Sequence, residues 1–205
     1  MNPFLGAYFV ILVIAVVLHE VAHGYAALLL GDTTAKDAGR LTLNPIKHID
    51  LLGSIIVPVV STLAGVPFGW AKPVPFNPDN LRNKKWGEAI VAAAGPATNL
   101  LLGLIFAIIF RLAAEGVFHF TDLQQALCAL VVLINIGLAI FNLLPMPPLD
   151  GSKILFALIP ARYSYIRQQL EHYQLALVAF VILFAGPIIQ PVLNWVFFIL
   201  TGVRI

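Results

Sequence analysis

Residues 16–30 read VVLHEVAHGYAALLL, an apolar run that contains two histidines and a glutamate. His19 and His23 are four residues apart, so on a helix they lie on one face and can reach the same metal ion. With Glu20 they form the pattern HExxH, in which the imidazoles bind zinc and the glutamate acts as general base toward water. The alternative is a chance match among structural polar residues.

The composition is that of a membrane protein. Of the 205 residues, 60% are hydrophobic and 11% are charged, and the mean hydropathy is +0.93; this lies outside the usual balance of soluble proteins. A charged carboxylate near the centre of a membrane span costs roughly 2.5–3.5 kcal/mol on insertion scales, so such residues usually have a function. This cost favours a metal site over a chance match. The net charge of +2 is too small to indicate a nucleic-acid partner.

Four segments are long enough to cross a bilayer, at about 20 apolar residues per crossing. They are residues 4–30, 88–110, 124–144 and 173–200. The last contains Pro187 and Pro191, which either kink one helix or divide it into two; we favour one kinked crossing. We therefore expect an all-α polytopic membrane protein with four transmembrane helices, or five if the last is split, and residues 1–205 forming a single membrane-embedded domain.

A further apolar piece, residues 50–70, either crosses the membrane or dips into it and returns. Lysine and arginine collect in short cytoplasmic loops. If the piece dips, ten of the 12 basic residues share one face and only Arg111 and Arg204 lie opposite; if it crosses, the division is seven against five. We therefore expect a re-entrant segment, followed over residues 72–85 by a short loop or hairpin whose prolines exclude a helix.

A catalytic zinc ion usually has three protein ligands and one open position, so a third donor is expected elsewhere. We favour Asp150, which follows three prolines that end the preceding span, while Gly151 lets the chain turn sharply. In the dipping topology His23 and Asp150 lie toward the same face. The alternative role for Asp150 is to cap the next helix. The other candidates are His48, His119, Asp122 and His172.

Three motifs together resemble the site-2 protease family of intramembrane zinc metalloproteases: HEVAH at 19–23, GPATN at 95–99 and NLLPMPPLDG at 142–151. They occur in the family's order, and the resemblance covers most of the chain. It implies a metalloprotease whose Zn²⁺ is bound by His19, His23 and Asp150, with Glu20 as the catalytic base. The substrate would be a membrane protein cleaved within or near a transmembrane segment.

The resemblance also implies roles for two asparagines, Asn99 and Asn142, in binding substrate or steadying an oxyanion. Either could instead form an interhelical hydrogen bond. The resemblance places the active site toward the cytoplasm, in agreement with the charge count, and we expect a multi-pass protein of the plasma membrane. No stretch is suited to a PDZ or CBS domain, and the sequence does not indicate an oligomeric state.

Two other functions are consistent with histidines and a glutamate in a span. One is a membrane metal-ion transporter, and the other is an inactive scaffold that binds zinc. A transporter needs polar residues along a whole path, whereas here they gather at one depth, which favours the protease. Ferrous iron also suits two histidines and a carboxylate, but HExxH with its adjacent base favours zinc.

Overall fold

Three long helices form the frame of the molecule. The computed structural model describes residues 3–51, 53–54, 57, 71–184 and 186–204, and within them it contains helices and no strand. Helices α1 (Pro3–Leu29), α4 (Gly87–Ala114) and α5 (Asp122–Asn142) are each long and apolar enough to cross a membrane. They confirm the first three predicted spans to within a few residues.

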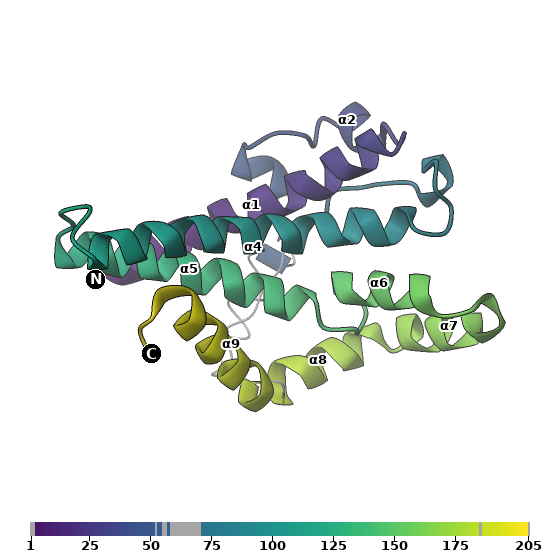
Figure 1. Cartoon of the computed structure of the whole chain (residues 1–205). Coiled ribbons are helices and arrows are strands. Elements are labelled where there is room, and N and C mark those ends of the chain that lie inside the picture. The colour runs from purple at the N-terminus through teal and green to yellow at the C-terminus, as the bar shows by residue number, and fades with distance from the viewer. Residues whose placement is uncertain (1–2, 52, 55–56, 58–70, 185, 205) are drawn as a thin grey trace.

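Helix α4 lies at the centre of the arrangement and contacts α1, α5, α6 (Asp150–Leu158) and α9 (Gly186–Thr201) (Figure 1). An apolar cluster joins α4, α5 and α9 through Ala107, Val132, Ile136 and Phe197. The close approach of α4 to α5 requires a glycine, since a Cβ at Gly103 would lie 2.7 Å from the Cδ1 of Ile136. Helices α1 and α6 both pack on α4 as well.

Local signals in the sequence set the ends of two of these helices. The amides of Gly31 and Asp32 donate to the carbonyls of Leu28 and Ala27, and Gly31 has a φ of 104°. This is a Schellman motif, which needs a glycine at the residue with positive φ. Helix α5 begins with a capping box between Thr121 and Gln124.

The fourth predicted span consists of two helices. Helix α8 (Gln174–Phe184) and α9 are bent by 61° at the break between them. At about 1.5 Å per residue, the 11 residues of α8 are too short for a hydrocarbon core of about 30 Å. The two helices therefore meet the length of a span only as a pair, and the break is sharper than the single kink that we favoured. Pro187 lies in the first turn of α9, where its missing N–H leaves no hydrogen bond unmade.

Short elements connect the long helices. Between α1 and α4 lie α2 (Thr34–Asp37), η1 (Pro45–His48) and η3 (Pro78–Asn80). The expectation that prolines exclude a helix from residues 72–85 is wrong for one turn, because Pro78 occupies the first position of η3. After α6 follow η4 (Ala161–Tyr163) and α7 (Ser164–His172).

Most of the predicted re-entrant segment, residues 50–70, lies outside the described residues, so it stays a prediction. Its flanks are described, and they meet: the Lys72 amide donates to the His48 carbonyl at 2.9 Å. The Arg82 amide likewise donates to the Leu30 carbonyl at 2.9 Å, so the end of α1 and the approach to α4 adjoin. A single crossing would separate such flanks by about 30 Å, so these contacts support ends on the same side of the membrane.

Asp32 fixes the end of α1 to the segment before α4. It is fully buried, at 0% exposure; its Oδ1 accepts from the Thr34 hydroxyl and the Asn80 side-chain amide, and its Oδ2 accepts from the Asn77 backbone amide. Burial acts to raise the pKa of this carboxyl, but the hydrogen bonds from Thr34, Asn80 and Asn77 outweigh it and hold the pKa below its ordinary value. The ionised form is therefore the one that the fold stabilises.

We expect Asp32→Ala to destabilise the protein, because the buried carboxylate loses the hydrogen bonds that Thr34, Asn77 and Asn80 donate to it, and a hydrogen bond to a charged group contributes roughly 1.5–3 kcal/mol. A pKa lowered by folding makes the contribution of Asp32 complete above the ordinary value of 3.8 and causes its loss as the pH falls through the folded value. Thermal unfolding in detergent from pH 3 to 7 should show a gap between wild type and variant that narrows below about pH 4. Asp37→Ala is the control, because this carboxylate is exposed and, among the described residues, its side chain bonds to Thr33 alone. An equal loss of stability in both variants would contradict the assignment.

Candidate metal centre

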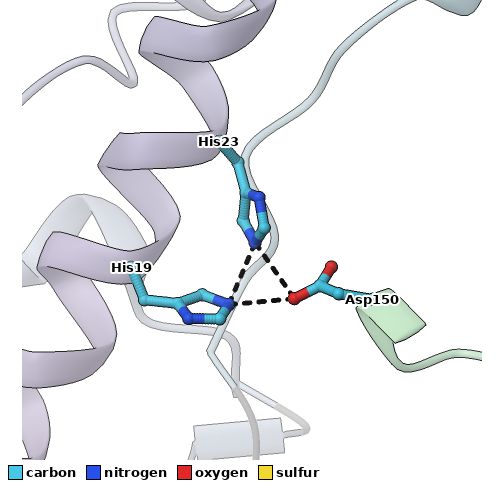
Figure 2. A group of neighbouring side chains, drawn as sticks. All are labelled: His19, His23 and Asp150. Atoms are coloured by element: carbon cyan, nitrogen blue, oxygen red, sulfur yellow. Dashed lines mark hydrogen bonds and ion pairs between the residues drawn. The ribbon is translucent and has the colours of Figure 1, made fainter. Parts of the chain in front are cut away.

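Three predicted ligands come together beside α4. His19 and His23 project from α1, and Asp150, the first residue of α6, projects toward them from the other side (Figure 2). The two Nε2 atoms are 2.9 Å apart, and Asp150 Oδ2 lies 3.2 Å from that of His19 and 3.3 Å from that of His23. The cluster is buried, with His19 at 6% and Asp150 at 7% exposure.

The outer nitrogen of each ring determines its protonation. His19 Nδ1 lies 2.6 Å from the side-chain oxygen of Asn99, and His23 Nδ1 lies 2.7 Å from the carbonyl oxygen of Val91. Because a carbonyl oxygen only accepts, each Nδ1 must carry the hydrogen. In the neutral rings both Nε2 atoms then have lone pairs, directed at each other and at the carboxylate.

This donor set fits a zinc ion. Three electron-pair donors about 3 Å apart repel one another unless a cation lies between them. Zinc bonds of about 2.0–2.1 Å at tetrahedral angles separate neighbouring ligand atoms by about 3.3 Å, close to the measured sides of this triangle. Two histidines and one carboxylate also leave the fourth position open, as catalytic zinc sites do.

The local structure around Asp150 differs from the prediction in two ways. Leu149, not Asp150, is the N-cap residue of α6, and no side chain caps this helix, so the capping alternative is wrong. Gly151 lies within α6 and does not have a positive φ. It is needed for a different reason: a Cβ at Gly151 would lie 2.3 Å from the carbonyl oxygen of Leu143, so only glycine lets α6 start against the end of α5.

Glu20 lies beside the ligand cluster but is held by another part of the chain. Its Oε2 accepts a hydrogen bond of 2.8 Å from the backbone amide of Val74. Residues 71–77 form no regular secondary structure. Arg40, at 7% exposure, fixes this segment by donating from Nη2 to the Lys72 carbonyl at 2.8 Å. The predicted base is therefore oriented by a main-chain amide.

The two predicted asparagines have different surroundings. Asn99 on α4 is at 0% exposure, and its polar atoms bond to His19, the Asn135 side chain and the Ala15 carbonyl. These contacts favour support of the metal site over direct contact with substrate. Asn142 at the end of α5 is half-buried and donates to the Leu138 carbonyl of its own helix; its predicted role stays untested.

Two residues at the site were not predicted. Asn135 on α5 is bonded to Asn99 and is 2% exposed; the only signal in the sequence is an amide in an apolar span, which is expensive in a membrane. Gly95 on α4 faces the imidazoles so closely that a Cβ would lie 2.5 Å from the Nε2 of both His19 and His23. Gly95 is the first residue of the GPATN motif, in which we had assigned a role to Asn99 but none to the glycine.

The other candidate ligands lie elsewhere in the described structure. His48 is buried at 2% exposure and donates from Nε2 to the Thr42 carbonyl. His119, Asp122 and His172 are exposed on connecting segments or at helix ends. Among the residues that the structure describes, His19, His23 and Asp150 form the group with the spacing of a metal site.

Comparison with known proteins gives a family and several relatives. Residues 114–186 match the description of peptidase family M50. The "Putative zinc metalloprotease YwhC" of Bacillus subtilis is 37% identical over 191 residues, which cover 89% of this chain and 84% of that protein. "Zinc metalloprotease MJ0392" of Methanocaldococcus jannaschii is 26% identical over 164 residues, covering 80% of this chain and 38% of that protein. No solved structure was found to match the chain.

We expect Gly95→Ala to weaken zinc binding at least tenfold, in the range of roughly 10–100-fold typical for changes next to metal ligands. The added methyl group would lie 2.5 Å from both Nε2 atoms and push the ligating rings out of position, although alanine is the better residue for a helix by about 1 kcal/mol. The measurement is zinc affinity by competition with a chelator, with thermal unfolding alongside. Gly137→Ala, whose Cβ would come no closer than 3.9 Å to its nearest neighbour, Leu193, is the control; unchanged affinity in Gly95→Ala would show that the site has room to spare.

Proposed function

The chain belongs to peptidase family M50, the site-2 protease family, and from this premise we propose that it hydrolyses a peptide bond within or near a transmembrane segment of membrane protein substrates. The observation that carries the proposal is the cluster of His19, His23 and Asp150, built on a helix apolar enough to span a membrane. Hydrolysis at this depth needs a way to activate water, and the cluster with Glu20 supplies one.

The proposed chemistry divides between the ion and the chain. Zinc, when bound, polarises a carbonyl and lowers the pKa of water. Glu20 takes a proton from the water that attacks the scissile carbonyl carbon, and it passes that proton to the amide nitrogen as the C–N bond breaks. The Val74 amide holds Oε2 at 2.8 Å, so it directs the carboxylate while Oε1 carries the proton. Asn99 and Val91 keep the hydrogens of the imidazoles away from the ligand atoms.

The substrate must present an extended backbone to this site. A helix engages its carbonyl oxygens in i to i−4 hydrogen bonds, so the scissile region has to unwind before attack. Residues 71–77, which form no regular secondary structure, contact Glu20 through the Val74 amide, and an unwound substrate strand would bind alongside this segment by β-addition. Asn142 is the last residue of α5, and the segment that follows it leads to Asp150. We propose that its side chain contacts the unwound backbone of the substrate.

We further propose that the site faces the cytoplasm from a plasma membrane. Ten of the 12 basic residues share one face in the topology with a re-entrant segment, and cytoplasmic loops carry such an excess. The contacts between His48 and Lys72 and between Leu30 and Arg82 support the same topology. The bilayer itself and a membrane-protein substrate are the partners that this arrangement implies.

A metal-ion transporter is not favoured. Transport needs polar groups along a path through the membrane. The metal-ligating group found in the described residues lies at a single depth. The relatives reported above are named as zinc metalloproteases.

We expect Glu20→Gln to retain zinc and lose cleavage, because the amide oxygen still accepts from Val74 but the side chain no longer takes a proton. Asp150→Ala should lose both zinc affinity and cleavage. The measurement is proteolysis of a transmembrane substrate in liposomes, with bound zinc quantified for each variant. Equal cleavage by wild type and Glu20→Gln would refute the assignment of Glu20 as the base. Zinc flux across the liposomes that depends on Glu20, without cleavage, would favour a transporter over a protease.

We also expect substrates with weakened helices to be cleaved faster. Placing a glycine pair at the scissile region costs the helix roughly 1 kcal/mol per residue relative to alanine, about 2 kcal/mol for the pair, so up to roughly 30-fold faster turnover is expected if unwinding limits the rate. Substrates that carry glycine or alanine pairs at that position, compared under single-turnover conditions, measure the effect. The same glycine pair placed ten residues away is the control, and an equal rate for all three would show that unwinding is not limiting.

A further inference from the structure

We propose that Asn135 determines which ring nitrogen of His19 carries the hydrogen, acting through Asn99, and thereby prepares His19 as a metal ligand. This makes Asn135 a positioning residue for the metal site, and the inference rests on the proposed function. His23 needs no such help, because its Nδ1 faces the main-chain carbonyl of Val91, which can only accept. His19 instead faces a side-chain amide, which has a donor end and an acceptor end.

The orientation of Asn99 decides the chemistry of His19. With its oxygen toward the ring, as observed at 2.6 Å, His19 Nδ1 must donate and Nε2 keeps the lone pair that a metal needs. If the amide were turned by 180°, its NH₂ group would face Nδ1. The hydrogen would then move to Nε2, directly between the ring and the position of the metal, and His19 would cease to be a ligand.

Two backbone carbonyls prevent that reversal, one of them through Asn135. Asn135 Nδ2 donates to the carbonyl of Val131 at 2.9 Å, and since that carbonyl only accepts, the oxygen of Asn135 must point the other way. It points at Asn99, whose Nδ2 lies 3.0 Å from it. The second donor hydrogen of Asn99 faces the Ala15 carbonyl at 3.4 Å. The order of donors and acceptors is therefore fixed from Val131 to His19.

Burial makes this order stringent. Exposure is 0% for Asn99, 2% for Asn135 and 6% for His19, so water does not substitute for a misdirected partner. A buried donor that faces a donor, or an acceptor that faces an acceptor, leaves both groups without a hydrogen-bond partner, and this strongly disfavours the reversed orientation. Asn135 also sits between Val132 and Ile136 of the apolar cluster that joins α4, α5 and α9. A side-chain amide is expensive at that point of a spanning helix, so it is expected to have a function. Fixing the orientation of Asn99 is such a function.

Zinc affinity of three variants tests the inference, measured by chelator competition on purified protein in detergent. Asn135→Leu removes the acceptor and should weaken zinc binding by roughly 10–100-fold, the usual effect of losing a partner of a ligating histidine. Asn135→Asp, neutral when buried, can donate to Val131 and accept from Asn99, so its affinity should stay within about threefold of wild type. Cys128→Ala is the control, because Cys128 is buried on α5 and bonds the Phe106 carbonyl of α4 without touching the relay.

A double variant separates orientation from simple packing. In Asn99→Asp the carboxylate faces the His19 ring, and with zinc bound the charge of the ion keeps it ionised, unlike an aspartate at position 135, which does not contact a ligand. Both of its oxygens then accept, so His19 Nδ1 meets an acceptor whichever way the side chain is turned. Adding Asn135→Leu to Asn99→Asp should then cost little further affinity, whereas a packing role for Asn135 would cost the same in both backgrounds. Unchanged zinc affinity in Asn135→Leu, or equal losses in Asn135→Leu and Asn135→Asp, would overturn the inference.

Cleavage of a transmembrane substrate by the same samples keeps the two proposals apart. If wild type binds zinc and Asn135→Leu binds it weakly, the inference holds even when no sample cleaves, and only the proposed protease activity fails. If wild type cleaves and Asn135→Leu binds zinc as tightly as wild type, the protease activity holds and the inference is overturned.

Discussion

The convergence of three electron-pair donors in an apolar environment is the constraint on which the rest of this structure depends. His19 and Asp150 are far apart in the chain, yet their ligand atoms lie 3.2 Å apart, which requires α1, α4, α5 and α6 to pack closely. Glycine permits two of these approaches: Gly95 lets α4 pass the imidazoles, and Gly151 lets α6 begin against the carbonyl of Leu143. The metal site therefore depends on the helix packing. A side chain at Gly95 would displace the imidazoles, and a side chain at Gly151 would displace the start of α6, which carries Asp150.

Main-chain atoms orient three of the four predicted site residues, namely His23, Glu20 and, through two asparagines, His19. The Val91 carbonyl sets the ring of His23, the Val74 amide sets the carboxylate of Glu20, and the Val131 carbonyl acts on His19 through two asparagines. In a membrane, where water is scarce, polar side chains lack the solvent partners that would otherwise tolerate several orientations. Backbone groups have fixed donor and acceptor roles, so they give each side chain one orientation that satisfies all partners.

Much of this could be predicted from the sequence, and the exceptions have physical reasons. The spacing of His19 and His23 on an apolar helix and the placing of Asp150 after the prolines are local or topological signals, and the structure brings these three residues together. Asn135 could not be predicted, because its partner Asn99 is on another helix and no periodicity relates the two. Gly151 was predicted to form a sharp turn, but it allows a close approach between α6 and the end of α5. Both situations require a glycine, so the sequence does not distinguish them. The break between α8 and α9 depends on how two short helices pack, which Pro187 and Pro191 permit but do not decide.

The segment between α1 and α4 connects the membrane topology to the chemistry. Residues 71–77 lack regular hydrogen bonding, so their polar groups need partners from other parts of the chain. Arg40 supplies donors for the Lys72 and Pro73 carbonyls, although its burial is expensive and no carboxylate pairs with it among the described residues. The backbone carbonyl of His48 accepts a hydrogen bond from the Lys72 amide, and the side-chain carboxylate of Asp32 accepts one from the Asn77 amide. The Val74 amide lies between these anchors and donates to Glu20. The cost of burying Arg40 is thus understandable as the cost of holding an irregular backbone where Glu20, the proposed base, requires a donor.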